Sequence, residues 1–217
     1  MAGNVAPNTV TDRLVVYLDA GNTVSYPGSG NSWRDISGNS NNGTLTNGPT
    51  FNSANLGSIV FDGVDDFFTG SFVCNKTFYS VDFWIFPTSV NDFNQGIGFN
   101  SFWGDFGLHT TAAGGVFVGT SVASRITPWR SNVYVTNVWQ NFTWTFNNGA
   151  SAFYKNGVLE TSATLAVSTS PQFTTFYSGN PNGLAGRLSN FKVYSGKALS
   201  ATEIIQNYNA LRGRYGL

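Results

Sequence analysis

Residues 141–147 alternate between aromatic and polar side chains, and this pattern constrains the fold more than any other in the chain. Phe142, Trp144 and Phe146 occupy every second position, and asparagine or threonine fills the positions between them. Successive side chains of a β-strand point to opposite faces of the sheet. The segment therefore predicts a strand with one face in an aromatic core and the other face polar.

Further short strand patterns recur along the chain with turn residues between them, as is typical of a sandwich of antiparallel sheets. The segment 81–86 is largely apolar on both faces, which predicts a central strand. Asn156-Gly157 predicts a two-residue hairpin turn, because both residues tolerate positive φ. The other strands are expected at 14–18, 58–61, 151–155, 173–177 and 187–194.

One helix is predicted, over residues 200–212. Ser200 and Glu203 have the spacing of a capping box, in which each side chain bonds the backbone N–H of the other residue. Ile204, Tyr208 and Leu211 recur at helical spacing, and Gly213 is expected to end the helix. The fold class is therefore all-β, a two-sheet antiparallel sandwich with one short C-terminal helix. Residues 14–217 form a single domain, preceded by an N-terminal arm at 1–13.

The charge of the chain excludes several partners. Lysine and arginine total 11 against 11 aspartates and glutamates, so the formal net charge is zero. A protein that binds nucleic acid through its phosphates usually carries an excess of basic residues, and this chain has no such excess, so nucleic acid is not an expected partner. No segment reaches the roughly 18 apolar residues of a membrane helix, so no membrane insertion is expected. The first residues also lack the pattern of a secretory signal peptide, which predicts synthesis in a cytoplasm.

Catalytic residues are sparse. Cleavage of a glycosidic bond requires two carboxyl groups held across it, but the chain has only two glutamates, Glu160 and Glu203, and neither has a carboxylate two or four residues away. The single histidine, His109, has no signature of a nucleophile nearby, and Cys74 is expected to be a small buried residue. No histidine and cysteine cluster could hold zinc. We therefore expect a protein that is not an enzyme.

Four stretches resemble the laminin G-like members of the concanavalin A-like lectin/glucanase superfamily. They combine characteristic residues in a fixed order over nearly the whole chain, namely residues 14–45, 61–66, 138–157 and 186–204. The resemblance implies a jelly-roll of two curved sheets and a helix after the last strand. Relatives in this superfamily that cleave glycans commonly carry a Glu-x-Asp-x-x-Glu strand. This chain lacks that motif, so the resemblance does not imply glycan cleavage.

The N-terminus and the ending at residues 208–216 resemble virion proteins of tailed bacteriophages. That resemblance implies a surface or appendage component, of the capsid-decoration or fibre type, located on the virion surface and made in the host cytoplasm. Its partners would be other virion proteins, further copies of itself and host cell-surface polysaccharide. The alternative is a calcium-dependent carbohydrate-binding module unconnected with a virion, with an extracellular location. A glycoside hydrolase is a third, weaker alternative.

Calcium is the one cofactor that the resemblance suggests, since many relatives bind a calcium ion. Asp35, Asn39 and Asp62 are the candidate ligands, and Asp65 and Asp66 could also contribute, because hard cations prefer oxygen ligands. The same aspartates could instead bond turn amides, as residues of Asx-turns do without any ion. We favour this second interpretation.

A sugar site requires an exposed aromatic ring beside polar groups. Trp103 with Asp105 and Trp129 with Arg130 are the candidate carbohydrate-binding residues, and the first pair lies in a glycine-rich segment. Both tryptophans could instead pack on the inner face of the sandwich, which is the more common position of a tryptophan in this architecture. Trp84, Trp139 and Trp144 are assigned to the core.

Overall fold

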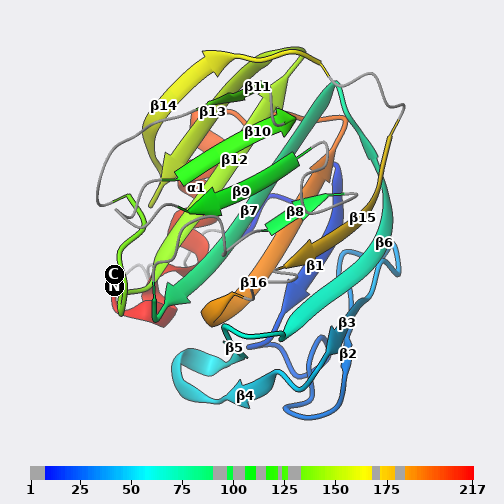
Figure 1. Cartoon of the computed structure of the whole chain (residues 1–217), viewed down its shortest axis with the longest axis vertical. Coiled ribbons are helices and arrows are strands. Elements are labelled where there is room, and N and C mark those ends of the chain that lie inside the picture. The colour runs from blue at the N-terminus through cyan, green and yellow to red at the C-terminus, as the bar shows by residue number, and fades with distance from the viewer. Residues whose placement is uncertain are drawn as a thin grey trace, which may run out of the picture.

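The computed structural model of the chain describes residues 8–89, 97–99, 106–110, 116–121, 124–126, 133–167, 172–178 and 184–217. Within these residues the chain forms two antiparallel sheets packed face to face, as predicted (Figure 1). The sheet that we call sheet A has the order β14-β13-β12-β7-β16-β5-β4, with β1 also paired to β16. Sheet B has the order β11-β10-β9-β8-β15-β6-β3-β2.

The strands of sheet A are β1 (Leu14–Asp19), β4 (Thr50–Asn52), β5 (Ser58–Asp62), β7 (Phe78–Pro87), β12 (Gln140–Asn147), β13 (Ala150–Lys155), β14 (Val158–Thr164) and β16 (Ala185–Ser195). The strands of sheet B are β2 (Ser32–Trp33), β3 (Gly43–Thr46), β6 (Phe67–Asn75), β8 (Ile97–Phe99), β9 (Phe106–Thr110), β10 (Val116–Ser121), β11 (Ser124–Ile126) and β15 (Gln172–Ser178). A 3₁₀ turn, η1 (Ala54–Leu56), joins β4 to β5.

The core between the sheets is aromatic, as the alternating pattern predicts. Phe142 packs against Phe153 with ring centroids 5.3 Å apart and against Tyr134 at 6.0 Å. Trp144 and Phe146 belong to the same buried cluster. The prediction for residues 141–147 is therefore confirmed, and β7 lies centrally between β12 and β16, also as predicted.

The outer face of sheet A carries a second buried layer, beneath helix α1 (Ala201–Leu211) and the following 3₁₀ turn η2 (Arg212–Tyr215). Trp84 stacks on Tyr215 with ring centroids 4.2 Å apart and on Tyr208 at 5.6 Å, and Trp139 packs on Tyr215 at 4.6 Å. Trp84 and Trp139 are buried, as predicted, but they lie under the helix and not between the sheets.

The helix begins with the predicted capping box. The backbone N–H of Glu203 donates to Ser200 Oγ, and Glu203 Oε2 accepts from the N–H of Ser200 at 2.9 Å. The helix was expected to run to residue 212 and to stop at Gly213. Instead α1 ends one residue earlier, at Leu211, and Gly213 lies inside η2, which ends at Tyr215 and is followed by Gly216 in the left-handed conformation. The backbone continues in the tighter turn because Tyr215 inserts beside Trp84 and Trp139.

Residues 8–13 of the predicted N-terminal arm pack against this helix. Val10 is buried, its N–H donates to Asn207 Oδ1 at 2.9 Å, and its carbonyl accepts from the Tyr194 hydroxyl at 3.0 Å. The start of the described chain is therefore fixed to the last helix by buried hydrogen bonds.

Two further local predictions are confirmed. Asn156 and Gly157 form the turn between β13 and β14 with φ values of 51° and 77°, the positive pair that a type I′ turn needs. Cys74 is fully buried, and burial raises the pKa of its thiol to about 12. A thiol with so high a pKa is protonated at neutral pH and is a poor nucleophile.

Candidate functional site

A shallow groove of about 340 Å³ lies over strands β3 and β6 of sheet B. It is lined by small side chains without charge, namely Ser40, Asn42, Thr44, Thr69, Gly70 and Ser71. Its size falls within the roughly 300–1,000 Å³ range of sites for small ligands.

The sequence of β6 explains why this groove is polar. Residues 67–75 alternate, so that Phe68, Phe72 and Cys74 are buried in the sandwich while Ser71 and Val73 are exposed. Thr44 of β3 lies directly opposite Thr69 of β6, and residues opposite one another in an antiparallel pair share a face. The two threonines therefore stand side by side on the outer face of sheet B.

The groove offers both hydrogen-bond donors and hydrogen-bond acceptors. Its serine and threonine hydroxyls can donate and accept, and Asn42 is held in place because its Oδ1 accepts from the Asp35 N–H at 2.9 Å. None of the described residues that line the groove is acidic or basic. Such a surface can pair with the hydroxyl groups of a neutral sugar but offers no charge to an anion or a cation.

This groove was not predicted from the sequence. The alternation of residues 67–75 was the available signal, but it identifies a strand and not which outward positions combine with β3. The candidate carbohydrate-binding residues Trp103, Asp105, Trp129 and Arg130 lie outside the described residues.

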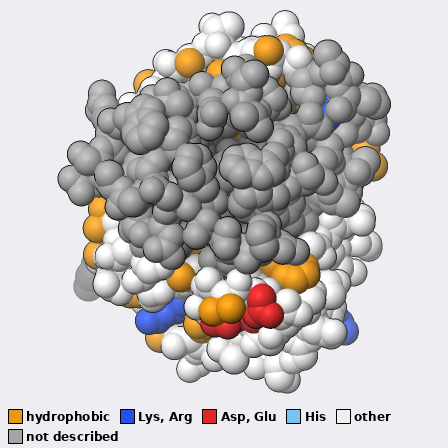
Figure 2. All heavy atoms as spheres, viewed as in Figure 1, with side chains coloured by type: hydrophobic (Ala, Val, Ile, Leu, Met, Phe, Trp, Pro, Cys, Tyr) orange, Lys and Arg blue, Asp and Glu red, His pale blue; other side chains and the backbone are white. Residues whose placement is uncertain are grey.

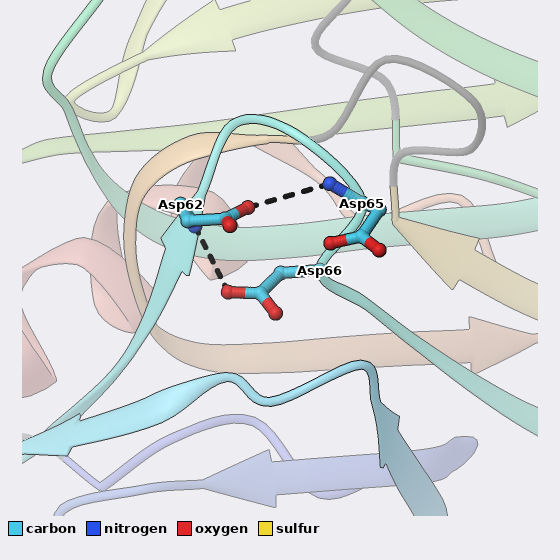
Figure 3. Close-up of side chains that lie close together, drawn as sticks. All are labelled: Asp62, Asp65 and Asp66. Carbon is cyan, nitrogen blue, oxygen red and sulfur yellow. Dashed lines mark hydrogen bonds between the residues drawn. The ribbon is translucent and has the colours of Figure 1, made fainter.

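The turn between β5 and β6 gathers three carboxylates (Figure 3). One oxygen each of Asp62, Asp65 and Asp66 lies within 4.8 Å of the others. Asp62 Oδ1 accepts from the backbone N–H of Val64 at 2.8 Å and of Asp65 at 3.4 Å, and the Asp62 N–H donates to Asp66 Oδ2 at 3.0 Å. Figure 2 shows acidic side chains on the same side of the molecule as sheet B.

The environments of these carboxylates differ. The hydrogen bond from the Val64 N–H is the main cause that lowers the pKa of Asp62. Burial raises the pKa of Asp66, and the charges of Asp62 and Asp65 add to the rise, against the hydrogen bond from the Asp62 N–H. Three oxygens at this spacing could bind a hard divalent cation, whose charge would relieve their mutual repulsion.

Asp35 and Asn39, the other candidate calcium ligands, form hydrogen bonds with backbone groups. Asp35 Oδ1 accepts from the N–H groups of Tyr17 and Ser37, at 2.8 and 2.9 Å. Asn39 donates from Nδ2 to the Leu14 carbonyl at 3.1 Å. Asp35 is not part of the three-carboxylate group in the described residues. The Asx-turn interpretation is thus confirmed for the hydrogen bonds of Asp35 and Asp62, and the presence of calcium stays a prediction.

Glu160 and Glu203 lie apart from the groove, on the edge strand β14 and in the helix cap. Across the described ranges, no helix is long and apolar enough to cross a membrane.

A protein-family model described as the concanavalin A-like lectin/glucanases superfamily matches residues 62–205, more than half of the chain. No curated protein sequence matches the chain at a significant level.

Solved structures share the fold at low sequence identity. Domain 4 of AbnA, an extracellular arabinanase of Geobacillus stearothermophilus solved with arabinotriose, has a TM-score of 0.69 and 16% identity, over 90% of this chain and 98% of that domain. The botulinum neurotoxin serotype D binding domain has a TM-score of 0.70 and 18% identity, over 93% of this chain and 52% of its own. Trypanosoma rangeli sialidase, in complex with sialic acid, has a TM-score of 0.70 and 13% identity, over 97% of this chain and 36% of its own. The chain thus spans the arabinanase domain but about half of the toxin domain.

Proposed function

The chain belongs to the concanavalin A-like lectin/glucanase superfamily, and from that premise we propose that it is a non-enzymatic, lectin-like module that binds a neutral polysaccharide. The observation that carries the proposal is the uncharged groove of hydroxyl and amide groups over β3 and β6. Sugar hydroxyls both donate and accept hydrogen bonds, and side chains of serine, threonine and asparagine complement them. The arabinanase domain solved with arabinotriose, over 98% of which the chain aligns, is a structural neighbour that supports a glycan ligand.

The non-enzymatic part of the proposal is supported by the position of the carboxylates. A glycosidase holds two carboxyl groups about 5–10 Å apart across the bond that it cleaves. The described groove has no acidic lining residue, and the three aspartates that do lie together form a turn in which Asp62 and Asp66 bond backbone N–H groups. We propose that this turn holds calcium at most and takes no part in hydrolysis.

The experiment is binding of the purified protein to a panel of neutral and acidic polysaccharides, with and without EDTA. We expect saturable binding to at least one neutral polymer. The variant Thr44→Val/Thr69→Val keeps the shape of the groove but removes two hydroxyls, and we expect it to weaken binding about tenfold, since each lost hydrogen bond costs about 0.5–1.5 kcal/mol. Thr50→Val, an exposed threonine on β4 of sheet A, is the matched control and should bind as the wild type does.

The outcomes separate the parts of the proposal. If no polysaccharide binds, the lectin-like function is wrong for this chain. Loss of binding in EDTA that Asp62→Asn/Asp65→Asn reproduces would support calcium, whereas binding indifferent to EDTA would remove calcium from the proposal and leave the module intact. New reducing ends after prolonged incubation with the bound polymer would overturn the non-enzymatic assignment.

The second candidate function is a surface or appendage component of a tailed-phage virion, of the capsid-decoration or fibre type. Its support is the resemblance of residues 208–216 to virion proteins of tailed bacteriophages, together with a formal net charge of zero. This role is compatible with the first, because an appendage can bind host cell-surface polysaccharide. Mass spectrometry of purified particles should detect the chain at a stoichiometry of structural proteins, and its absence from them would reject the virion role and favour an extracellular module.

A further inference from the structure

One wall of the groove is a loop that is held from outside the groove. Ser40 and Asn42 line the groove from the segment that joins β2 to β3, whereas the other lining residues stand on strands β3 and β6. The segment is fixed to strand β1, because Asn41 Nδ2 donates to the Val15 carbonyl at 2.7 Å. Hydrogen bonds that lie outside the groove therefore help to set the position of this wall.

Asp35 is the centre of this loop. Its Oδ2 accepts from the N–H of Asn41 at 2.9 Å, and its Oδ1 accepts from the N–H groups of Tyr17 and Ser37, at 2.8 and 2.9 Å. Its own N–H donates to Asn42 Oδ1 at 2.9 Å. A backbone N–H can donate to the oxygen of a side-chain amide but not to its nitrogen, so this bond fixes which way the Asn42 amide points. Its Oδ1 is bonded to the loop, and its Nδ2 is the group left for a ligand.

The polar side chains that line the groove are free to bind a ligand. Asn42 is exposed, and its Nδ2 donates no hydrogen bond within the part of the chain that the structure describes. The same holds, with the same restriction, for the hydroxyls of the other lining residues, namely Ser40, Thr44, Thr69 and Ser71. An amide NH₂ group only donates, whereas a hydroxyl both donates and accepts. A ligand must therefore place an acceptor at Asn42 and can place a donor at a neighbouring hydroxyl.

Small apolar groups lie beside these polar ones. Thr44 and Thr69 are directly opposite one another on β3 and β6, which places their Cβ atoms about 4.5–5.5 Å apart. Each threonine carries a methyl group next to its hydroxyl, and Gly70 lines the groove without a side chain. The groove therefore combines a fixed donor, several hydroxyls and a place where a small apolar group can pack.

We propose that the groove selects a polysaccharide of N-acetylated amino sugars, and that Asp35 is a positioning residue for this selection. The acetamido carbonyl accepts from Asn42 Nδ2, the acetamido N–H donates to a hydroxyl of the groove, and the acetyl methyl packs on the methyl groups of Thr44 and Thr69. Acetylation removes the charge of the amino group, which suits a groove whose described lining carries no charge. This inference rests on the proposed function, since it names the class of sugar that the same groove binds.

Calorimetric titrations with matched oligosaccharides test the inference. The probes are oligomers of N-acetylglucosamine and of N-acetylgalactosamine, each paired with the oligomer of glucose or galactose that has the same length and linkage. We expect the N-acetylated member of at least one pair to bind at least about tenfold more tightly, because the plain sugar lacks the amide that bonds Asn42 and the hydroxyls. Chemical removal of the acetyl groups from the bound oligomer should abolish this preference, since an ammonium group has donors and no acceptor.

Asn42→Asp tests the donor itself. The variant keeps the oxygen that accepts from the Asp35 N–H but replaces the Nδ2 donor with a carboxylate oxygen. We expect it to bind the N-acetylated oligomer about tenfold more weakly, and to bind the deacetylated oligomer more tightly than the wild type does, because a carboxylate attracts an ammonium group. Asn52→Asp is the matched control on β4 of sheet A, where Asn52 Oδ1 likewise accepts from a backbone N–H, at 2.9 Å from Ala54. It adds the same charge and should bind as the wild type does.

Asp35→Asn tests the positioning role. An amide has one oxygen where the carboxylate has two, so it cannot accept from all the N–H groups that Asp35 bonds, and the wall that carries Asn42 is held less firmly. We expect the ratio of the affinities for the N-acetylated and the plain oligomer to fall toward one. An Asp35→Asn variant that weakens both oligomers by the same factor would overturn the positioning role. Matching thermal melts would show that each variant folds.

The outcomes distinguish this inference from the proposed function. Equal affinity for the two members of every pair, saturable binding only to polymers without acetamido groups, or an Asn42→Asp variant that keeps the preference would each overturn the inference and leave a lectin-like module. Absence of binding to any oligomer or polysaccharide would reject the proposed function, and the inference with it.

Discussion

Asp82 and Lys192 form an ion pair without solvent exposure on the outer face of sheet A. Lys192 Nζ lies 2.8 Å from Asp82 Oδ1, and Asp82 Oδ2 accepts from the Thr143 hydroxyl at 2.7 Å and from Asn141 Nδ2 at 3.1 Å. All of these side chains are buried in the layer between the sheet and helix α1. A buried charge is tolerated only with such partners, because desolvation costs several kcal/mol for each ion.

Breaking this pair on one side should be strongly destabilising. We expect Lys192→Met to lower the free energy of unfolding by about 3–5 kcal/mol in urea titrations, because Asp82 stays buried without its counter-ion. The double variant Asp82→Asn/Lys192→Met should lose less than the sum of its single variants. Lys197→Met, which removes the more exposed pairs with Asp12 and Glu203, should cost no more than about 1 kcal/mol. Additive losses would show that Asp82 and Lys192 do not stabilise each other.

Individual residues could be predicted from the sequence where the local pattern determines their environment. The alternation about Trp144 placed it correctly in the inter-sheet core. Trp84 of β7 points to the outer face of sheet A. There it is buried by Tyr208 and Tyr215, which lie more than a hundred residues later in the sequence. A pattern within one strand can show that a face is apolar, but not that a distant helix covers it.

At the scale of elements, α1 depends on its first turn, because the capping box satisfies N–H groups that have no partner inside the helix. Ser200→Ala removes the side chain that accepts from the Glu203 N–H, and we expect a loss of about 1 kcal/mol in the free energy of unfolding. Thr202→Ala, at an exposed position in the same turn, should be neutral or slightly stabilising, since alanine is the better helix former. Equal losses in both variants would show that the box does not stabilise the helix.

Elements with strong local signals were predictable and the others were not. The predicted strand at 141–147 corresponds to β12 within one residue, and the helix cap was identified from two residues. Strand β6 was missed although its residues alternate, because Thr69, Gly70 and Ser71 interrupt the run with residues that favour turns. The candidate groove lies at these residues, so its prediction failed with that of the strand.

For the whole molecule, pairings distant in the sequence decide where the groove lies. Strand β16 pairs with β1, β5 and β7, and β6 pairs with β3 and β15. The resemblance to a known superfamily predicted the two-sheet architecture correctly. It could not show that Thr44 and Thr69 lie opposite one another, because that register depends on how β3 meets β6 and not on either segment alone.

Neutrality is also a property of the whole molecule, and it predicts how binding responds to salt. Only 10% of residues are charged, the formal net charge is zero, and the lining of the groove that the structure describes carries no charge. Interactions between exposed charges weaken as salt shortens the Debye length from about 30 Å at 0.01 M to about 3 Å at 1 M, whereas hydrogen bonds between hydroxyls are not screened in this way. We therefore expect the dissociation constant for a neutral polysaccharide to change less than about twofold over that range of salt. Titration calorimetry at several salt concentrations measures it, and a steep loss of affinity would indicate that the ligand is an anionic polymer bound by lysine and arginine outside the groove.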